Sequence, residues 1–144
     1  MKFITLLVAL STFALHTLAL SNGVVRVTYD NTYDNPKASL FNTACSNGEN
    51  GLLKKYPTLD QIPNFPFVGG MPGLTWNSPD CGSCWELKYT KGTTTRTIYV
   101  TAVDGSWSFN LAQKAMDALT GGLAVDKGAV DAVATRVDAK KCGM

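Results

Sequence analysis

The sequence predicts a small, mainly β domain that closes as a barrel, carries one or two short helices and is held by two disulfide bonds. Three observations support this prediction. Most patterned segments are short and alternate apolar with polar residues, as half-buried strands do. One clear helical stripe lies in the C-terminal third, and four cysteines occur in a chain of 144 residues that begins like a secretory precursor. Short strands, few helices and two bridges are together typical of a small closed barrel.

Residues 1–19 have the pattern of a secretory signal peptide. Lys2 supplies the positive charge, an apolar run follows, and Thr17-Leu18-Ala19 offers small residues before a cleavage point. Ala19-Leu20-Ser21 is a second candidate for cleavage. The apolar run is short for a membrane span of about 20 residues. We therefore expect residues 1–19 to be removed and residues 20–144 to form one secreted, extracellular domain with no membrane partner.

Removal of the leader narrows the chemistry that the chain can perform. The sequence has 13 Lys and Arg against 11 Asp and Glu, and losing Lys2 leaves the charges nearly balanced. A nearly neutral domain argues against nucleic acid as a partner. The one histidine, His16, lies in the leader, so the mature domain lacks the residue used by Ser-His-Asp and Cys-His catalysis and by most zinc hydrolases. We expect no metal and no cofactor.

In the first half of the domain, the patterns predict one strand and short helical turns. Residues 24–29 alternate and predict a strand. Residues 50–56 predict a short helix entered from a polar turn. Thr58 and Gln61 form a capping-box pattern for another helical turn. Pro63 and Pro66 then predict an extended loop that runs to Gly69-Gly70.

The second half of the chain carries the stronger patterns. Residues 85–90 alternate, and the β-branched run 97–103 predicts a second strand. Asn110 and Gln113 form a capping pattern before the clearest helix, which should end at Gly121-Gly122 and bury one stripe: Leu111, Ala112, Ala115, Met116 and Leu119. Residues 129–139 are rich enough in alanine to allow a helix, although Val133, Thr135 and Val137 alternate as in a strand. The sequence contains no repeat or linker, so we expect one domain.

Four cysteines in a small exported chain indicate two structural disulfides, and three pairings are open: the residues are Cys45, Cys81, Cys84 and Cys142. Cys81 and Cys84 have the spacing of a redox pair. Such a pair normally opens a helix, whereas the residues after Cys84 predict a strand. We therefore interpret these cysteines as structural.

The stretch from Ala44 to Leu87 contains Cys45-Ser46-Asn47-Gly48 and, later, Pro79-Asp80-Cys81-Gly82-Ser83-Cys84-Trp85. With these motifs it resembles the cerato-platanins, a family of small secreted fungal proteins. The resemblance extends over nearly all of the chain after the leader, through Val27-Thr28-Tyr29-Asp30, Ala102-Val103-Asp104, Phe109-Asn110 and Val137 to Cys142. It implies a six-stranded double-psi β-barrel, shared with expansin domains, barwins and some endoglucanases. It also implies the pairs Cys45–Cys81 and Cys84–Cys142.

The resemblance implies a secreted, non-enzymatic protein of the fungal cell wall that binds chitin or N-acetylglucosamine oligomers in a groove across the barrel. Expansin-like wall loosening, plant-defence elicitation through a plant receptor, binding to other wall polysaccharides and self-association are further expectations. The alternative is a weak glycoside hydrolase or lytic transglycosylase. Glycoside cleavage normally needs two facing carboxyl groups. Only Glu49 and Glu86 are glutamates, but the aspartates leave such a pair open.

Seven residues are candidates for the sugar-binding groove. Asp104 and Asn110 match family positions on the sugar-binding surface, although Asp104-Gly105 also fits a turn at a strand end and Asn110 a helix N-cap. Trp107 departs from the glycines frequent in that loop, and its indole either stacks on a sugar or folds back over the barrel end. The remaining four are expected at the rim: Tyr29, Asp30, Asn47 and Gly48. Asn47-Gly48 also fits a simple turn, and Trp76 and Trp85 are expected in the core.

Overall fold

The computed structural model describes residues 23–144, so the predicted signal peptide and its candidate cleavage points lie outside the described residues. Within this range the strands form a closed barrel. Its strands are joined in the order β1-β5-β2-β4-β3-β6, with these bounds: β1 (Gly23–Tyr29), β2 (Val68–Pro72), β3 (Cys84–Lys91), β4 (Thr94–Ser106), β5 (Phe109–Leu111) and β6 (Ala129–Val137). The predicted six-stranded barrel is confirmed.

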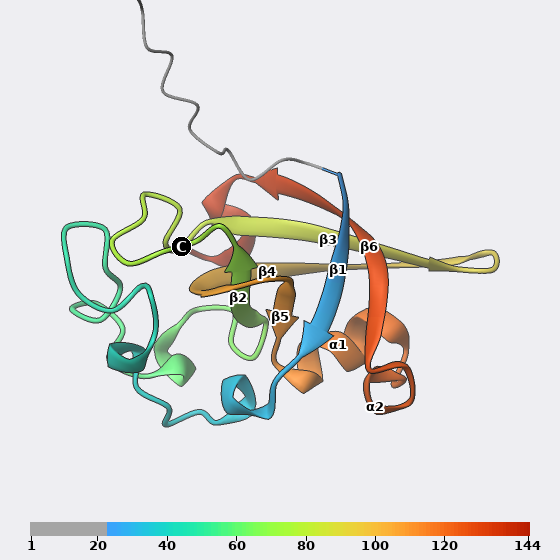
Figure 1. Ribbon diagram of the computed structural model, residues 1–144, viewed down its shortest axis with the longest axis horizontal. Coiled ribbons are helices and arrows are strands. Elements are labelled where there is room, and N and C mark those ends of the chain that lie inside the picture. The colour runs from blue at the N-terminus through green and yellow to red at the C-terminus, as the bar shows by residue number, and fades with distance from the viewer. Residues whose placement is uncertain (1–22) are drawn as a thin grey trace, which may run out of the picture.

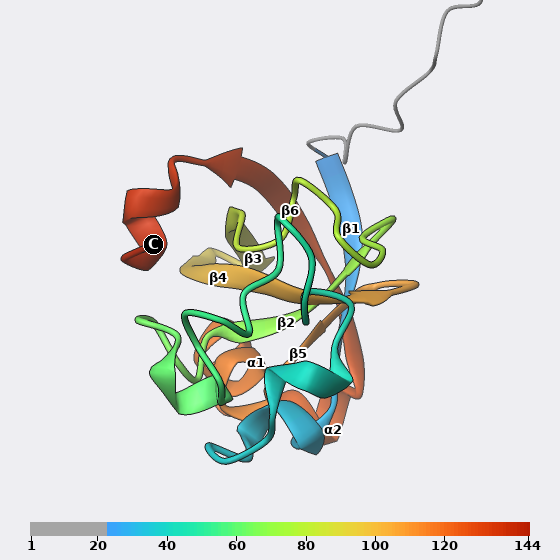
Figure 2. The same ribbon diagram turned by 90° about the vertical axis from the view of Figure 1, so that its left-hand side faces the viewer.

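Parallel and antiparallel pairing are combined in this barrel. β1 lies parallel to β5 and β2 parallel to β4, while the other neighbouring pairs are antiparallel. β3 and β4 form a long hairpin that projects from one end of the molecule (Figure 1). The long connection between β1 and β2 lies at the other end and faces the viewer in Figure 2.

The helices are short and lie outside the barrel. They are α1 (Gln113–Thr120), α2 (Ala124–Lys127) and the 3-10 helices η1 (Asn31–Asp34), η2 (Leu40–Asn42), η3 (Leu59–Gln61) and η4 (Ala139–Cys142). α1 buries Ala115, Met116 and Leu119, and it ends at Gly121 in the left-handed conformation with φ 76°, as predicted. Among residues 23–144, no helix has the length and apolar character needed to cross a membrane.

The predicted start of α1 is wrong. Asn110 does not cap a helix but lies in the centre of β5, where it pairs with Thr28 of β1 and Gly70 of β2. The chain turns into the helix only after Leu111. The first helical N–H groups instead donate to the carboxylate of Asp34, a residue far away in the sequence. A local capping pattern cannot reveal such a partner.

Two further local predictions in the first half are wrong. Residues 50–56 form turns rather than a helix, because the N–H groups of Leu52 and Leu53 donate back to the carbonyls of Cys45 and Ser46. Gly69-Gly70 belongs to β2 rather than to a loop. A Cβ on Gly69 would lie 2.4 Å from the Asn110 carbonyl oxygen, so glycine permits the close approach of β2 and β5.

The capping-box pattern at Thr58 is partly confirmed. Thr58 is the N-cap of η3, but its side chain makes no capping hydrogen bond. Its hydroxyl donates to Oδ1 of Asp60 at 2.5 Å instead. The local sequence therefore places the turn correctly but not its side-chain contacts.

The alanine-rich segment, for which a helix and a strand were both open, forms the strand β6. Val130, Ala132 and Ala134 are buried, whereas Val133 is 46% exposed. Ala134 pairs directly with Leu87 of β3. Large side chains from β3 fill the barrel interior, which leaves room only for small residues on β6.

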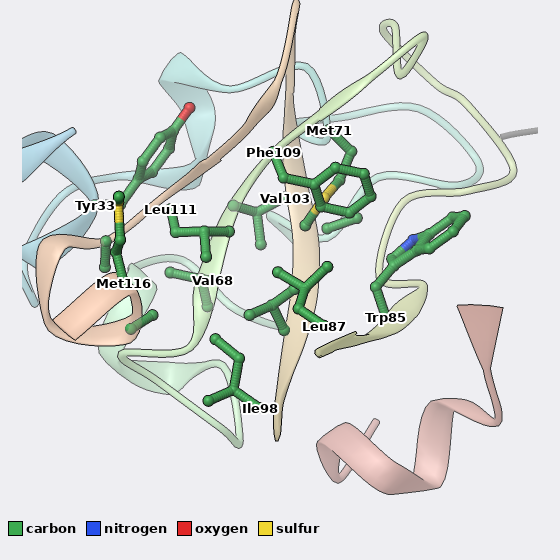
Figure 3. Close-up of a cluster of buried hydrophobic side chains, with 14 of the residues drawn as sticks. Tyr33, Val68, Met71, Trp85, Leu87, Ile98, Val103, Phe109, Leu111 and Met116 are labelled. Carbon is green, nitrogen blue, oxygen red and sulfur yellow. The ribbon is translucent and has the colours of Figure 1, made fainter. Parts of the chain in front are cut away.

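The core contains one of the two tryptophans predicted there. Trp85 is fully buried, and its ring meets Phe109 edge to face with centroids 5.5 Å apart (Figure 3). Its indole N–H donates to Ser83 Oγ, so the buried nitrogen is satisfied. The prediction for Trp76 is wrong, since that side chain is 61% exposed.

Both predicted disulfides are confirmed. Cys45 pairs with Cys81 and Cys84 with Cys142, with Cα atoms 5.4 and 5.7 Å apart. The first bridge joins the β1–β2 connection to the loop before β3. The second joins the start of β3 to η4. The two bridges therefore attach the long connection and the C-terminus to the barrel.

Candidate functional site

A cavity of about 600 Å³ lies between the β1–β2 connection and β4. Most of the residues that line it carry polar or charged side chains, which can exchange hydrogen bonds with a ligand rich in hydroxyl groups. The lining residues are Asp30, Thr32, Tyr33, Asn35, Lys37, Ala38, Ser39, Asn42, Thr43, Leu59 and Asp104. Two of the seven predicted site residues, Asp30 and Asp104, therefore meet in one cavity.

Asp104 is held firmly by three hydrogen-bond donors. Its Oδ1 accepts from the backbone N–H groups of Ala44 and Gly105, both at 2.8 Å, and its Oδ2 accepts from the Tyr33 hydroxyl at 3.0 Å. A carboxylate has about four acceptor positions, so Oδ2 keeps one for a ligand. Asp104 lies within β4 rather than at its end, because the strand continues to Ser106.

A β-bulge in the pairing of β2 with β4 positions the carboxylate of Asp104. β2 pairs Gly69 with Ala102 but Gly70 with Asp104, so Val103 is passed over. The carbonyl of Val103 instead accepts from the Cys45 N–H. The bulge thus aims Asp104 toward the β1–β2 connection.

Tyr33 is a site residue that the sequence analysis missed. Its ring is buried, and its hydroxyl oxygen points away from the neighbouring core side chains (Figure 3). Burial, reinforced by the negative charge of Asp104, raises the pKa of the Tyr33 phenol above its ordinary value. The phenol therefore remains a donor to Asp104. The sequence signal that could have identified Tyr33 is a single aromatic residue within the polar segment after Asp30.

Asn110 lies beside Asp104 but outside the cavity lining. Gly70 pairs with Asp104 on one side and Asn110 on the other, so the two residues are about two strand spacings, roughly 10 Å, apart. Asn110 Oδ1 accepts from the Thr28 hydroxyl at 2.9 Å. Within residues 23–144, no group accepts a hydrogen bond from its amide nitrogen, which leaves a donor for a ligand.

Trp107 lies in the turn between β4 and β5 and is 79% exposed, so it does not cover the barrel end. Its exposed indole is compatible with stacking on a sugar. Asp30 caps η1 by accepting from the Thr32 N–H at 2.8 Å while also lining the cavity. Tyr29 is half-buried against the core at the end of β1 and does not line the cavity.

Asn47 and Gly48 lie at a different hollow. They line a space of about 280 Å³ together with Ser46, Gly51, Leu53 and Lys54. Gly48 has φ 96°, so the turn itself favours glycine there. Two of the predicted site residues therefore line the cavity at Asp104 and two line this second hollow, while Tyr29, Trp107 and Asn110 line neither.

Comparison with protein families adds to this geometry. The family model described as Cerato-platanin matches residues 25–144. This chain belongs to the cerato-platanin family. Allergen Asp f 15 of Aspergillus fumigatus is 46% identical over 120 residues, which cover 82% of this chain and 76% of that protein.

Solved cerato-platanin structures share the fold. The crystal structure of cerato-platanin 2 from M. perniciosa has a TM-score of 0.81 at 42% identity, covering 85% of this chain and 100% of that one. The solution structure of the fungal elicitor Cerato-Platanin has a TM-score of 0.73 at 37% identity, covering 82% and 96%. The mainly β barrel with two disulfides is therefore that of the cerato-platanin family.

The chemistry available in this cerato-platanin cavity is recognition through hydrogen bonds. Asp104 accepts from three groups and Asp30 from a backbone N–H. Each carboxylate keeps acceptor positions that a ligand hydroxyl can use. Among residues 23–144, no cluster of His, Cys, Asp and Glu is arranged to hold a metal ion.

Proposed function

We propose that this protein binds N-acetylglucosamine oligomers of chitin in the cavity beside Asp104 and does not cut them. One observation supports this most: Asp104 and the Tyr33 hydroxyl form a preorganised polar pair in a cavity of about 600 Å³. Asn110 lies across Gly70 from Asp104, and Trp107 presents an exposed indole in the turn between β4 and β5. An oligosaccharide presents hydroxyl groups to such acceptors and apolar ring faces to an indole.

The expected affinity is modest. Each hydrogen bond to a sugar hydroxyl replaces one to water and contributes about 0.5–1.5 kcal/mol net. Binding should become tighter with longer oligomers, because more of the polar surface is then used. It should depend little on salt, because the ligand is neutral.

A weak glycoside hydrolase or lytic transglycosylase is the alternative. The observation in its favour is that two carboxylates, Asp30 and Asp104, line one cavity, as cleavage of a glycosidic bond requires. Release of new reducing ends from chitin or cellulose would decide between the two. We expect none from the wild type.

The wider role proposed here is that of a secreted protein acting at the fungal cell wall. The proposed activities there are expansin-like wall loosening and elicitation of plant defence. The further proposed partners are a plant receptor, other wall polysaccharides and other copies of this protein. A solved relative of 37% identity is described as a fungal elicitor. The leader predicted in residues 1–19 supports export.

The test is a titration of the mature protein with chitin oligomers, followed by NMR shifts, on the variant Asp104→Asn. The amide keeps the shape and one acceptor oxygen but loses the charge, so the dissociation constant should rise about tenfold. Asp126→Asn is the matched control, because it removes an exposed carboxylate from α2. Asp104→Ala is less informative, since it also leaves the N–H groups of Ala44 and Gly105 without their acceptor. Unchanged affinity in Asp104→Asn would remove Asp104 from the site.

A further inference from the structure

Trp76 is an exposed indole held in a fixed position. Its side chain is 61% exposed, yet its Nε1–H donates to Asn47 Oδ1 at 2.7 Å. Single exposed hydrophobic side chains are ordinary on a protein surface, so the informative feature of Trp76 is the fixed position of its ring. The hydrogen bond orients the ring without covering it.

The two turns that carry this pair are joined by further bonds. Asn50 donates its backbone N–H to Asn77 Oδ1 at 2.9 Å and its amide to the Asn77 carbonyl at 3.0 Å. Asn77 itself has φ 58°, the left-handed conformation that few non-glycine residues adopt. The Cys45–Cys81 disulfide connects the same two segments covalently.

Gly48 lies where the turn that carries Asn47 meets the turn that carries Trp76. A Cβ at this position would lie 2.6 Å from Asn77 Oδ1. The turn around Gly48 therefore packs directly on the turn that carries Trp76. A conformation with an unusual backbone angle and close packing, next to an exposed aromatic ring, is the kind found at binding sites.

The two segments that hold this ring begin beside Asp104 and Gly105. The segment leading to Asn47 passes Ala44, whose N–H donates to Asp104. The segment leading to Trp76 passes Leu74, whose carbonyl oxygen would lie 2.2 Å from a Cβ on Gly105. Both segments therefore start in contact with Asp104 and Gly105 of β4, and the bonds between their two turns hold them together beyond that point.

We propose that Trp76 is a stacking platform for a sugar ring of the same polysaccharide chain, forming a second subsite beyond Asp104. The proposal rests on the proposed function, because it takes chitin as the ligand. An indole face offers the apolar surface that pyranose CH groups contact. The Asn47 amide at the indole edge supplies a polar group for a sugar hydroxyl, and the largely apolar hollow of about 280 Å³ beside Asn47 offers further surface to the ring faces of the sugar. Asn47 acts as a positioning residue.

The experiment compares a long ligand with a short one. Long chitin oligomers reach both subsites, whereas the disaccharide fills only the cavity at Asp104. In Trp76→Ala, affinity for the long oligomer should fall about three- to tenfold while that for the disaccharide stays unchanged. Asn47→Ala should give a smaller loss for the long oligomer alone. Val125→Ala, which removes another exposed apolar side chain from α2, should change neither.

Each outcome separates this proposal from the proposed function. If Asp104→Asn weakens binding but Trp76→Ala leaves the long oligomer bound as in the wild type, the second subsite is wrong and the cavity stands. If Trp76→Ala weakens long and short ligands equally, Trp76 does not form a separate subsite. If the wild type binds no oligomer at all, both proposals fail.

Fluorescence provides a readout that a purely structural role would not change. In a Trp107→Phe background, the emission accessible to a soluble quencher comes from Trp76, since Trp85 is fully buried. The long oligomer should protect this emission from quenching and the disaccharide should not. Equal quenching with and without the long oligomer would overturn the proposal.

Discussion

The phenol of Tyr33 belongs to both the core and the cavity. Its ring is 7% exposed and packs with the barrel core, while its hydroxyl donates to Asp104 at 3.0 Å. A Cβ on Gly70 would lie 3.2 Å from that hydroxyl oxygen. The absence of a side chain at Gly70 therefore lets Tyr33 reach across the outer surface of the sheet to the carboxylate.

Carboxylates on the surface make the stability depend on pH. Hydrogen bonds from Lys37 and then Thr58 hold the pKa of Asp60 below its ordinary value. Hydrogen bonds from Lys88 and then Tyr99 do the same for the pKa of Glu86. A folded-state pKa below the unfolded one contributes stability above the unfolded pKa, and this is lost as the pH falls through the folded one.

We therefore expect the free energy of unfolding to decrease as the pH falls below the ordinary carboxyl range, near about 4. Lys37→Met should lower stability at neutral pH and leave it unchanged in strong acid, because protonated Asp60 no longer attracts Lys37. Denaturant unfolding of both proteins across this pH range measures the difference. A difference that persists undiminished in strong acid would contradict the assignment to this pair.

At single positions, the sequence predicted those residues whose role depends on a local motif. Asp104 was identified by its motif and does line the cavity. Tyr33 and Trp76 were not identified, because their polar partners, Asp104 and Asn47, are distant in the sequence. Composition and spacing along the chain carry no signal for such pairs.

At the scale of elements, the N-terminus of α1 depends on a distant cap. The N–H groups of Gln113 and Lys114 donate to Asp34 at 2.7 and 3.1 Å. The carboxylate satisfies two otherwise unpaired donors and places a negative charge at the positive end of the helix. The same contact ties η1, which carries Tyr33, to α1.

Asp34→Ala should therefore lower the free energy of unfolding by about 1 kcal/mol, within the range of about 0.5–2 kcal/mol for lost helix caps. Asp34→Asn, which keeps one acceptor oxygen, should lose less. Denaturant unfolding measures both free energies, provided that their dependence on denaturant concentration is the same as in the wild type. If the alanine variant is as stable as the wild type, the cap contributes nothing to folding.

Some of the secondary-structure elements could likewise be predicted from the local sequence, whereas others depend on contacts with distant residues. Alternation was enough to locate β1 and β3, because a half-buried strand repeats every two residues, and a β-branched run located β4. For β6 the alternation left a helix open. β5 was mistaken for a helix start, since its three residues are strand only through pairing with β1 and β2. Likewise the buried face of β6 was decided by the large side chains of β3, not by its own pattern.

At the scale of the whole molecule, the two disulfides have different neighbours. Cys45–Cys81 joins the segments that carry Asn47 and Trp76, and Cys45 follows Ala44, which donates to Asp104. Cys84–Cys142 joins β3 to η4. The first bridge therefore supports both parts of the proposed binding surface, and the second supports the barrel alone.

The two bridges join cysteines that are separated by 36 and by 58 positions in the sequence. The loss of chain entropy in the unfolded state predicts that each bridge stabilises the fold by roughly 4 kcal/mol. Removing either pair should lower the melting temperature by on the order of 15 °C in a domain of this size. The two double variants should differ in binding. Cys45→Ala with Cys81→Ala should also weaken chitin-oligomer binding below the melting transition, because Ala44 and Asn47 lose their anchor. Cys84→Ala with Cys142→Ala should bind as the wild type does. Calorimetry combined with oligomer titration checks both, and equal binding by the two variants would show that the first bridge does not shape the site.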